Sequence, residues 1–345
     1  LLIYLSVAFA QEVKWMSIGD LHNWYSAAGS EIEVGRTGQV SDQQDGLRYP
    51  AFYRVQDNQA AKGLWLGASN FYDPVVNKNY DKKVVHAGPR HLDIENETMP
   101  ISITMDGKYD HPNVFVDGDP ATNLQYLDYV DNVDPSLKSD RKINNIVQTS
   151  LGVQMKRTIY AFAHPDHQNY HIQEYVFTNN GCFDKDCNTS YEQTIEGFQV
   201  YLQYRYAISR EGMVYDGNWL PQSAAWGHNT MNDVIGENPS TPSINDQFYD
   251  NGEIMRAFFS WQGYHSDASF DNIGGPNAPG EGHLGAAQFV GVATLHADTS
   301  PSDNADDIAQ PSTTWFITSD DPTTSGNDQY NETKSINEYT NYMTV

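Results

Sequence analysis

Three histidines fall within one short stretch, HPDHQNYH, and raise the question of a metal site. His164, His167 and His171 are spaced three and four residues apart, so an α-helix would place them on one face. Imidazole nitrogens arranged in this way can bind Zn²⁺, and a metal-dependent hydrolase using this cluster is one hypothesis. Pro165 and the strand-like alternation that begins by Tyr170 favour a turn followed by a strand instead. We therefore expect only His171 to enter a sheet.

Aspartates gather in turn-rich segments, where their oxygens could bind Ca²⁺. The clusters are Asp117 with Asp119, Asp128 with Asp131 and Asp134, Asp303 with Asp306 and Asp307, and Asp320 with Asp321. None of them has the spacing of an EF-hand loop. The competing interpretation is turn chemistry, because Asp side chains accept hydrogen bonds from their own backbone. Both interpretations stay open, and Asp117 and Asp119 are the first candidates for Ca²⁺.

The sequence contains two cysteines, Cys182 and Cys187, in the stretch GCFDKDCN. In an exported chain this pair predicts a disulfide that closes a short loop. A loop this small removes little entropy from the unfolded chain, so we expect a modest effect on stability. A zinc site would need further ligands nearby.

Motifs of the common enzyme classes do not occur in the sequence, which has no HExxH, no G-x-S-x-G and no phosphate-binding glycine loop. A glycosidase would need two carboxylates, for which the candidates are Glu174, Glu211, Glu253 and Glu281. Three tryptophans in or beside Asn/Gly-rich loops could stack on sugars, namely Trp219, Trp226 and Trp261. The competing interpretation is that these rings close the ends of a hydrophobic core. No catalytic residue is assigned, and a carbohydrate-binding or carbohydrate-cleaving module is kept as an alternative.

Composition narrows the class of protein. Aromatic residues make up 12% of the 345 residues, which predicts a folded chain. The net charge of -25 disfavours nucleic acid and anionic lipid as partners and favours cations such as Ca²⁺. The opening run LLIYLSVAFAQ has an apolar core followed by Ala8-Phe9-Ala10, as at the end of a signal peptide. A buried N-terminal strand is the alternative. We expect residues 1–10 to be a signal-peptide remnant of an exported protein without a membrane-inserted segment.

Strands rather than helices must position these residues. The block 149–208 contains three runs with alternating or β-rich character separated by polar connections, which predicts an antiparallel meander. Further strand-like runs lie at 48–55, 63–71, 82–90, 253–261, 286–296 and 313–319. We therefore expect an all-β antiparallel sandwich of one or two packed modules with long Asp/Asn/Gly-rich loops. The expected segments are an N-terminal β module at 11–105, an acidic connection at 106–148 and a β-sandwich module at 149–345.

The run IVQTSLGVQMKRTIYAFAHPDHQNYHIQEYVFTNNG resembles a stretch of large secreted proteins of Bacteroidetes-related and other environmental bacteria. In those proteins a T-S-x-G strand is followed by a strand that ends in N-T-G, whereas this chain has Asn179-Asn180-Gly181. The pairs GLWLGASNF with VVHAGPR, and GAAQFVGVATLHAD with PSTTWFITSDDP, fit the same group. Its members carry a C-terminal sorting module for a secretion system. The resemblance implies secretion and a β-rich architecture, and it assigns no activity to any residue.

These observations predict a secreted or cell-surface protein with a structural or adhesive role. Partners would be further copies of the chain, other surface proteins or glycans, with Ca²⁺ as a candidate loop stabiliser. It would form part of a larger extracellular polypeptide.

Overall fold

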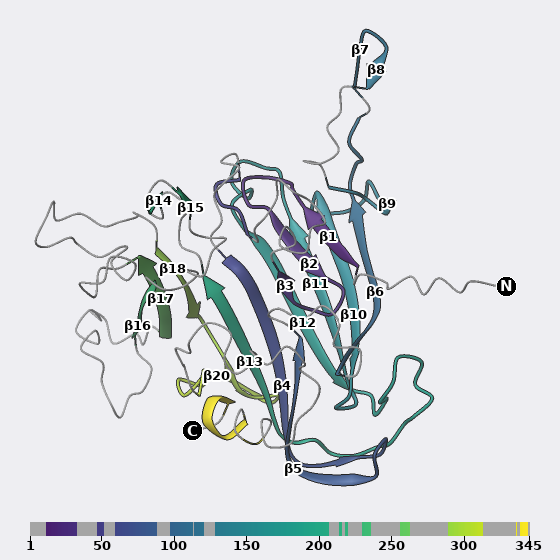
Figure 1. Ribbon diagram of the computed structural model, residues 1–345, viewed down its shortest axis with the longest axis vertical. Coiled ribbons are helices and arrows are strands. Elements are labelled where there is room, and N and C mark those ends of the chain that lie inside the picture. The colour runs from purple at the N-terminus through teal and green to yellow at the C-terminus, as the bar shows by residue number, and fades with distance from the viewer. Residues whose placement is uncertain are drawn as a thin grey trace, which may run out of the picture.

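The computed structural model describes residues 12–32, 47–51, 59–87, 97–112, 114–120, 128–206, 214–215, 218–219, 230–235, 256–262, 289–312, 336 and 339–343. This part of the chain is nearly all β, with several antiparallel sheets, which confirms the expected fold class. Figure 1 shows two large sheets packed face to face. None of the described helices is long and apolar enough to cross a membrane.

The first large sheet has the strand order β12-β11-β10-β6-β9. Its strands are β6 (Thr98–Gly107), β9 (Asn132–Val133), β10 (Arg141–Thr149), β11 (Val153–Ala161) and β12 (His171–Asn179). All pairings are antiparallel except the short one between β6 and β9. Alternation fixes the two faces, because Ile143, Asn145 and Val147 of β10 are buried while the residues between them are partly exposed. We call this the five-stranded sheet.

The second large sheet is built around the long strand β4 (Gln59–Asp73). It pairs with β13 (Glu196–Tyr206) on one side, and with β3 (Glu31–Ile32) and β5 (Lys78–Ala87) on the other. We call this the β4 sheet. Its outer side is covered by the π-helical turn η5 (Tyr339–Met343), whose Tyr339 and Met343 pack on Trp65. The central strand is therefore buried on both faces.

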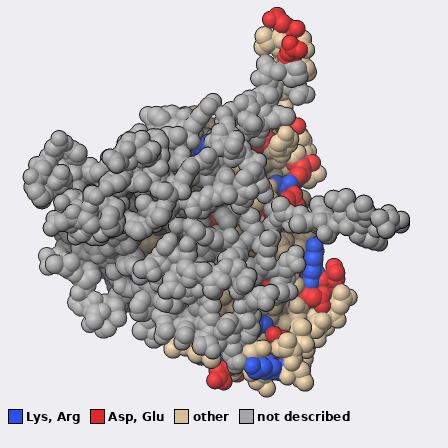
Figure 2. All heavy atoms as spheres, viewed as in Figure 1, with Lys and Arg blue, Asp and Glu red and all other residues tan. Residues whose placement is uncertain are grey.

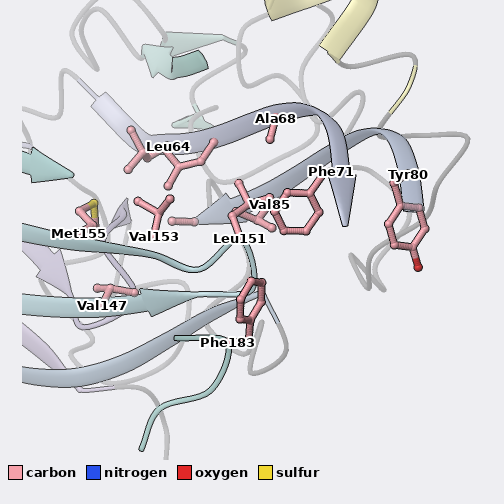
Figure 3. Packing of buried hydrophobic residues seen from close by; sticks show 12 residues of the cluster. Leu64, Ala68, Phe71, Tyr80, Val85, Val147, Leu151, Val153, Met155 and Phe183 are labelled. Carbon is pink, nitrogen blue, oxygen red and sulfur yellow. The ribbon is translucent and has the colours of Figure 1, made fainter. Parts of the chain in front are cut away.

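The main core lies between the two sheets. Leu64, Phe71 and Val85 come from the β4 sheet and face Val153 and Met155 of the five-stranded sheet (Figure 3). Each such side chain, when fully buried, contributes on the order of 2 kcal/mol through removal of apolar area from water. The two sheets therefore form a β-sandwich held by one shared hydrophobic layer.

A hairpin covers the rest of the inner face of the five-stranded sheet. It is formed by β1 (Val13–Met16) and β2 (Asn23–Ser26), which pair antiparallel. Met16 and Tyr25 of this hairpin pack with Met105, Ile143 and Ile159 in a second buried cluster. The first strands within the described residues are therefore integral to the sandwich.

Smaller sheets complete the described structure. β16 (Thr230–Ile235), β17 (Arg256–Gln262) and β18 (Phe289–Thr294) form a three-stranded sheet. Three hairpins are formed by β7 (Phe115–Val116) with β8 (Asp119–Pro120), β14 (Val214–Tyr215) with β15 (Asn218–Trp219), and β19 (Asp298–Ser300) with β20 (Asp303–Asp306). Phe258 of β17 lies against Tyr204 of β13, with ring centroids 5.7 Å apart, so this sheet contacts the edge of the sandwich.

The chain crosses between the sheets where a meander is predicted. β11 and β12 pair as expected, but β13 leaves them and pairs with β4. The connection 180–195 contains the Cys182–Cys187 disulfide and carries the chain from one sheet to the other. Sheet pairing also crosses the predicted segment boundaries, because β6 pairs with β10 and β4 pairs with β13. The predicted segments 11–105, 106–148 and 149–345 thus contribute strands to one sandwich.

Candidate functional site

The strand β12 ends the five-stranded sheet. Within the described residues it pairs only with β11, and that register runs from Val153–Asn179 to Ala161–His171 without a shift. Its sequence, HIQEYVFTN, has no proline and no lysine, the residues that often protect an edge strand. Ile172 and Val176 point away from the core and are 48% and 46% exposed. Nine regular residues with exposed aliphatic side chains make β12 a surface suited to strand addition or face packing.

The strand β13 ends the β4 sheet on the same side of the sandwich (Figure 1). Phe198 of β13 meets Phe177 of β12, with ring centroids 6.0 Å apart. Val200 and Leu202, on the same strand, are exposed. The two terminal strands therefore lie on the same side of the sandwich, beside the three-stranded sheet (Figure 1), and aliphatic side chains are accessible on both.

A buried carboxylate lies directly behind β12. Glu31 of β3 is almost inaccessible and accepts four hydrogen bonds. One oxygen accepts from Asn23 Nδ2 at 2.7 Å and Gln59 Nε2 at 3.1 Å. The other accepts from Gln173 Nε2 at 2.9 Å and Lys62 Nζ at 3.2 Å. These donors come from β2, β4 and β12, so one carboxylate ties the edge strand to both layers of the sandwich.

Lys62 is the cationic partner of Glu31. The two residues stand opposite each other in the β3–β4 register, and Lys62 Nζ also lies 5.4 Å and 5.7 Å from the ring centroids of Tyr175 and Tyr204. Burial opposes the charge on Lys62, but Glu31, Tyr175 and Tyr204 together outweigh this effect and raise the pKa of the ammonium. Burial likewise opposes ionisation of Glu31, yet Lys62 and then Arg157 hold the pKa of its carboxyl below the usual range. The pair is therefore ionised.

A histidine and a tyrosine extend this network to the start of β12. The Tyr25 hydroxyl and His171 Nδ1 are hydrogen-bonded at 2.7 Å. Burial lowers the pKa of His171 to about 4 and raises the pKa of Tyr25. Both groups are therefore neutral at neutral pH. Arg157 lies beneath them and donates to the carbonyl oxygens of Gly29 and Ser26, each at 2.8 Å.

This arrangement positions a strand. All four donors to Glu31 are protein groups, and His171 is held by Tyr25. A buried carboxylate with four donors fixes the groups around it, because each broken bond would leave a polar atom buried and unpaired. The chemistry that this network supports is a rigid, pre-organised β12 at the edge of the sandwich.

The histidine cluster separates as the alternation predicts. His171 begins β12, whereas His164 and His167 lie in the exposed turn before it. His167 Nδ1 is hydrogen-bonded to the Tyr170 hydroxyl at 2.6 Å, and the rings of His164 and His167 are 5.6 Å apart. Among the residues that the structure describes, no group of three or more His, Cys, Asp or Glu side chains is placed to hold a metal ion. The metal-dependent hydrolase remains an untested hypothesis.

The aspartates proposed as calcium ligands have separate protein partners. Asp128 forms an ion pair with Arg141. Asp131 accepts hydrogen bonds from Lys14 and from the backbone N–H of Met105. Asp134 accepts from both the N–H and the hydroxyl of Ser136, which lower the pKa of its carboxyl. Their shared spacing therefore does not bring the three carboxylates to one point, because each faces a different donor.

The other acidic candidates are divided between turns and undescribed segments. Asp117 occupies a hairpin turn, and Asp119 begins β8. Asp306 pairs with Arg256, with both carboxylate oxygens 2.9 Å from Nη2, and Asp307 and Asp303 accept from nearby backbone N–H groups. Asp320 and Asp321 lie outside the described residues.

Few of the proposed carbohydrate contacts can be compared with the structure. Trp219 ends β15 and Trp261 lies within β17, while Trp226 lies outside the described residues. Glu174 is exposed on β12, and Glu211, Glu253 and Glu281 also lie outside the described part of the chain. The carbohydrate hypothesis remains a prediction. The predicted disulfide between Cys182 and Cys187 is present.

Sequence reasoning missed the polar network. Glu31, Lys62 and Gln173 are far apart in the chain and share no motif. The one available signal was local, because Gln173 and Tyr175 lie on the alternating face of a strand that is expected to point inward. A polar residue at such a position implies buried donors and acceptors, although it does not identify them.

Comparisons with known proteins add no relatives. A scan against protein-family models, a search of curated proteins and a search of solved structures each gave no match to this chain.

Proposed function

We propose that this chain is a secreted or cell-surface β-sandwich protein with a structural or adhesive role, and that it self-associates through β12 and the outer face beside it. The observation that carries the proposal is β12 itself. It is a regular terminal strand, held rigidly by the Glu31 network, with Ile172 and Val176 exposed. A pre-organised edge loses little conformational entropy on binding, so its exposed backbone and aliphatic groups favour association.

The disulfide supports the proposed location. Cys182 and Cys187 are bonded, and disulfides persist in oxidising compartments such as the cell exterior. Ca²⁺ is proposed as a stabiliser on the strength of the net charge of -25. Specific calcium binding should raise the Tm more than Mg²⁺ does at matched ionic strength, and equal effects of the two ions would count against it.

Sedimentation velocity tests the self-association. We expect the wild-type chain to form species larger than a monomer as concentration rises, and Ile172→Thr/Val176→Thr to weaken their formation. Val75→Thr/Val76→Thr is the matched control, because these residues are 60% and 57% exposed in the β4–β5 turn. A wild-type chain that stays monomeric at every concentration, with and without Ca²⁺, would overturn the proposal.

A further inference from the structure

An apolar hairpin projects from the sandwich. We call the hairpin of β7 and β8 the arm, and Figure 1 shows it standing clear of both large sheets. Val114, Phe115 and Val116 lead into its turn and are 48%, 61% and 58% exposed. Scattered apolar residues on a surface are ordinary, but a projecting hairpin with exposed apolar side chains on both of its faces indicates a contact surface.

The turn of the arm has a defined conformation. Val116 pairs with Asp119, so Asp117 and Gly118 form a two-residue loop with φ angles of 53° and 88°. Positive φ at both positions is the mark of a type I′ turn, the common two-residue connection of a hairpin. A side chain at Gly118 would meet nothing within 4 Å, so the tip is open to solvent. Figure 2 shows acidic side chains at this tip.

The base of the arm is clamped to the sandwich by a buried arginine. Arg141 of β10 donates from Nη1 to the carbonyl oxygen of Tyr109 at 3.0 Å, on the segment leading to the arm. Its Nε and Nη2 donate to Asp128, on the returning segment, at 3.0 to 3.1 Å. His111 Nε2 lies 2.7 Å from Asp128 Oδ1 and joins the two segments directly. Both segments are thus fixed where they leave the sheet.

The outer face of the five-stranded sheet carries a surface that complements the apolar and acidic arm. Val176, Lys156 and Ile146 stand directly opposite one another across β12, β11 and β10. We call this row the stripe. Directly opposed residues share a face, and Lys156 and Val176 are exposed. Lys156 forms no ion pair with another described residue, so a cation flanked by two aliphatic side chains faces outward.

We propose that the arm of one copy docks on the stripe of a second copy. Val116 would pack on Val176 and Ile146, while Asp119, which stands opposite Val116 in the hairpin and shares its face, would approach Lys156. The acidic tip argues against an anionic membrane as the partner. The inference rests on the proposed self-association and names the segments that perform it. Because arm and stripe are different surfaces, the contact is heterologous and leads to open chains of molecules unless the rotation closes a ring.

Mixing two complementary variants tests this contact in the full-length chain. The arm variant, Phe115→Ser/Val116→Ser, keeps its stripe, and the stripe variant, Lys156→Glu/Val176→Ser, keeps its arm. We expect the dissociation constant for self-association of each variant alone to be at least about tenfold higher than that of wild type. An equimolar mixture should form dimers that do not extend, because one intact arm then meets one intact stripe. Val75→Ser/Val76→Ser should associate as wild type does.

The outcomes separate the arm inference from the proposed function. If the arm variant associates as wild type does while Ile172→Thr/Val176→Thr does not, self-association stands and the arm is not its donor. If the mixture remains monomeric, the heterologous contact is overturned. Binding of wild type, but not of the arm variant, to neutral phosphatidylcholine vesicles without self-association would assign the arm to lipid instead. Unfolding curves that coincide with wild type would show that the substitutions leave the fold intact.

Discussion

Glu31 illustrates how a carboxylate can remain ionised inside a sandwich. Burial alone would favour its neutral form, but Lys62 lies opposite and three amide groups complete its hydrogen bonds. Such a pair contributes little relative to a well-packed apolar pair, yet breaking it is costly because one charge stays buried. In this sandwich the pair ties Gln173 of β12 to β3 and β4 through Glu31.

Glu31→Gln should lower the free energy of unfolding by about 3 kcal/mol or more. The amide nitrogen cannot accept from the donors around it, and Lys62 loses its counter-charge. Denaturant titration of the single variant measures the loss, and Lys185→Met at an exposed position is the matched control. Adding Lys62→Met to Glu31→Gln should cost less than the sum of the two single changes. An additive double variant would show that the two side chains are not coupled.

Because of His171, the free energy of unfolding should decrease as the pH is lowered. Burial lowers its pKa in the folded protein to about 4, whereas an unfolded histidine has a pKa of about 6.5. The folded state therefore binds fewer protons than the unfolded state. The contribution of His171 to the free energy of unfolding is fully present above pH 6.5 and is lost as the pH is lowered toward 4. One such group corresponds to about 3 kcal/mol across this window. His22, which burial also brings to a pKa of about 4, acts in the same direction.

Equilibrium unfolding at a series of pH values measures this effect. His171→Leu should reduce the slope of stability against pH between 6.5 and 4 by up to one proton, whatever it does to stability at pH 8. Val75→Thr, at an exposed position that carries no ionisable group, should leave the slope unchanged. An unchanged slope in the His171 variant would contradict the assignment of His171 as a buried neutral base.

At the scale of elements, the neighbouring strands β11 and β12 have different roles. β11 is central and its Ile159 is fully buried, whereas β12 is terminal and its Ile172 is 48% exposed. The same residue type therefore serves packing on one strand and accessible surface on the next.

Ile159→Ala should lower the free energy of unfolding by about 2 to 5 kcal/mol, the range found for aliphatic deletions in a core. Ile172→Ala should change it by less than about 1 kcal/mol and should reduce self-association instead. Thermal or denaturant unfolding, with sedimentation velocity on the same samples, measures both effects. Equal losses of stability at the two positions would mean that β12 is not an exposed edge.

Periodicity identified some elements and missed others for physical reasons. The alternation in 153–161 and 170–181 predicted β11 and β12 because one face of each strand is buried. β10 fell within the predicted acidic connection, since Asn144 and Asn145 interrupt its hydrophobic pattern. Asn145 is nevertheless buried, and its amide donates to the carbonyl oxygens of Ala27 and Ser102. Such partners are provided by distant strands, so a single sequence cannot reveal them.

The arm was not predicted from the sequence, because its aspartates drew attention to metal binding. VFVDGDP was interpreted through its aspartates, although strand-forming residues before Asp-Gly are a strong hairpin signal.

For the whole molecule, net charge opposes association. Each copy carries a formal charge of -25, so two copies repel each other over a distance set by the ionic strength. The screening length falls from about 30 Å at about 10 mM salt to about 8 Å at about 150 mM. Exposed contacts such as Lys156 with an acidic tip are worth at most about 1 kcal/mol and mainly set orientation.

Raising the NaCl concentration from about 10 mM to about 150 mM should therefore strengthen self-association. Sedimentation velocity at several protein concentrations gives the dissociation constant at each salt level. Matched Na₂SO₄ at the same ionic strength would control for effects of the chloride ion. Weaker association at higher salt would show that local ion pairs, rather than overall repulsion, control assembly.

The long-range contacts of the β1–β2 hairpin also determine when it can fold during synthesis. Tyr25 bonds to His171, Ala27 accepts from Asn145, and Gly29 accepts from Arg157, over separations of 146, 118 and 128 residues. The β1–β2 hairpin therefore cannot complete its apolar contacts until β11, which ends at Ala161, has left the ribosome, and the Tyr25 hydroxyl gains its partner only with His171. Long-range pairing of this kind is slow, and strands that are still unpaired can mispair or aggregate before it is complete. Residues 13–26 should therefore stay accessible to a holding chaperone for much of the synthesis of the chain.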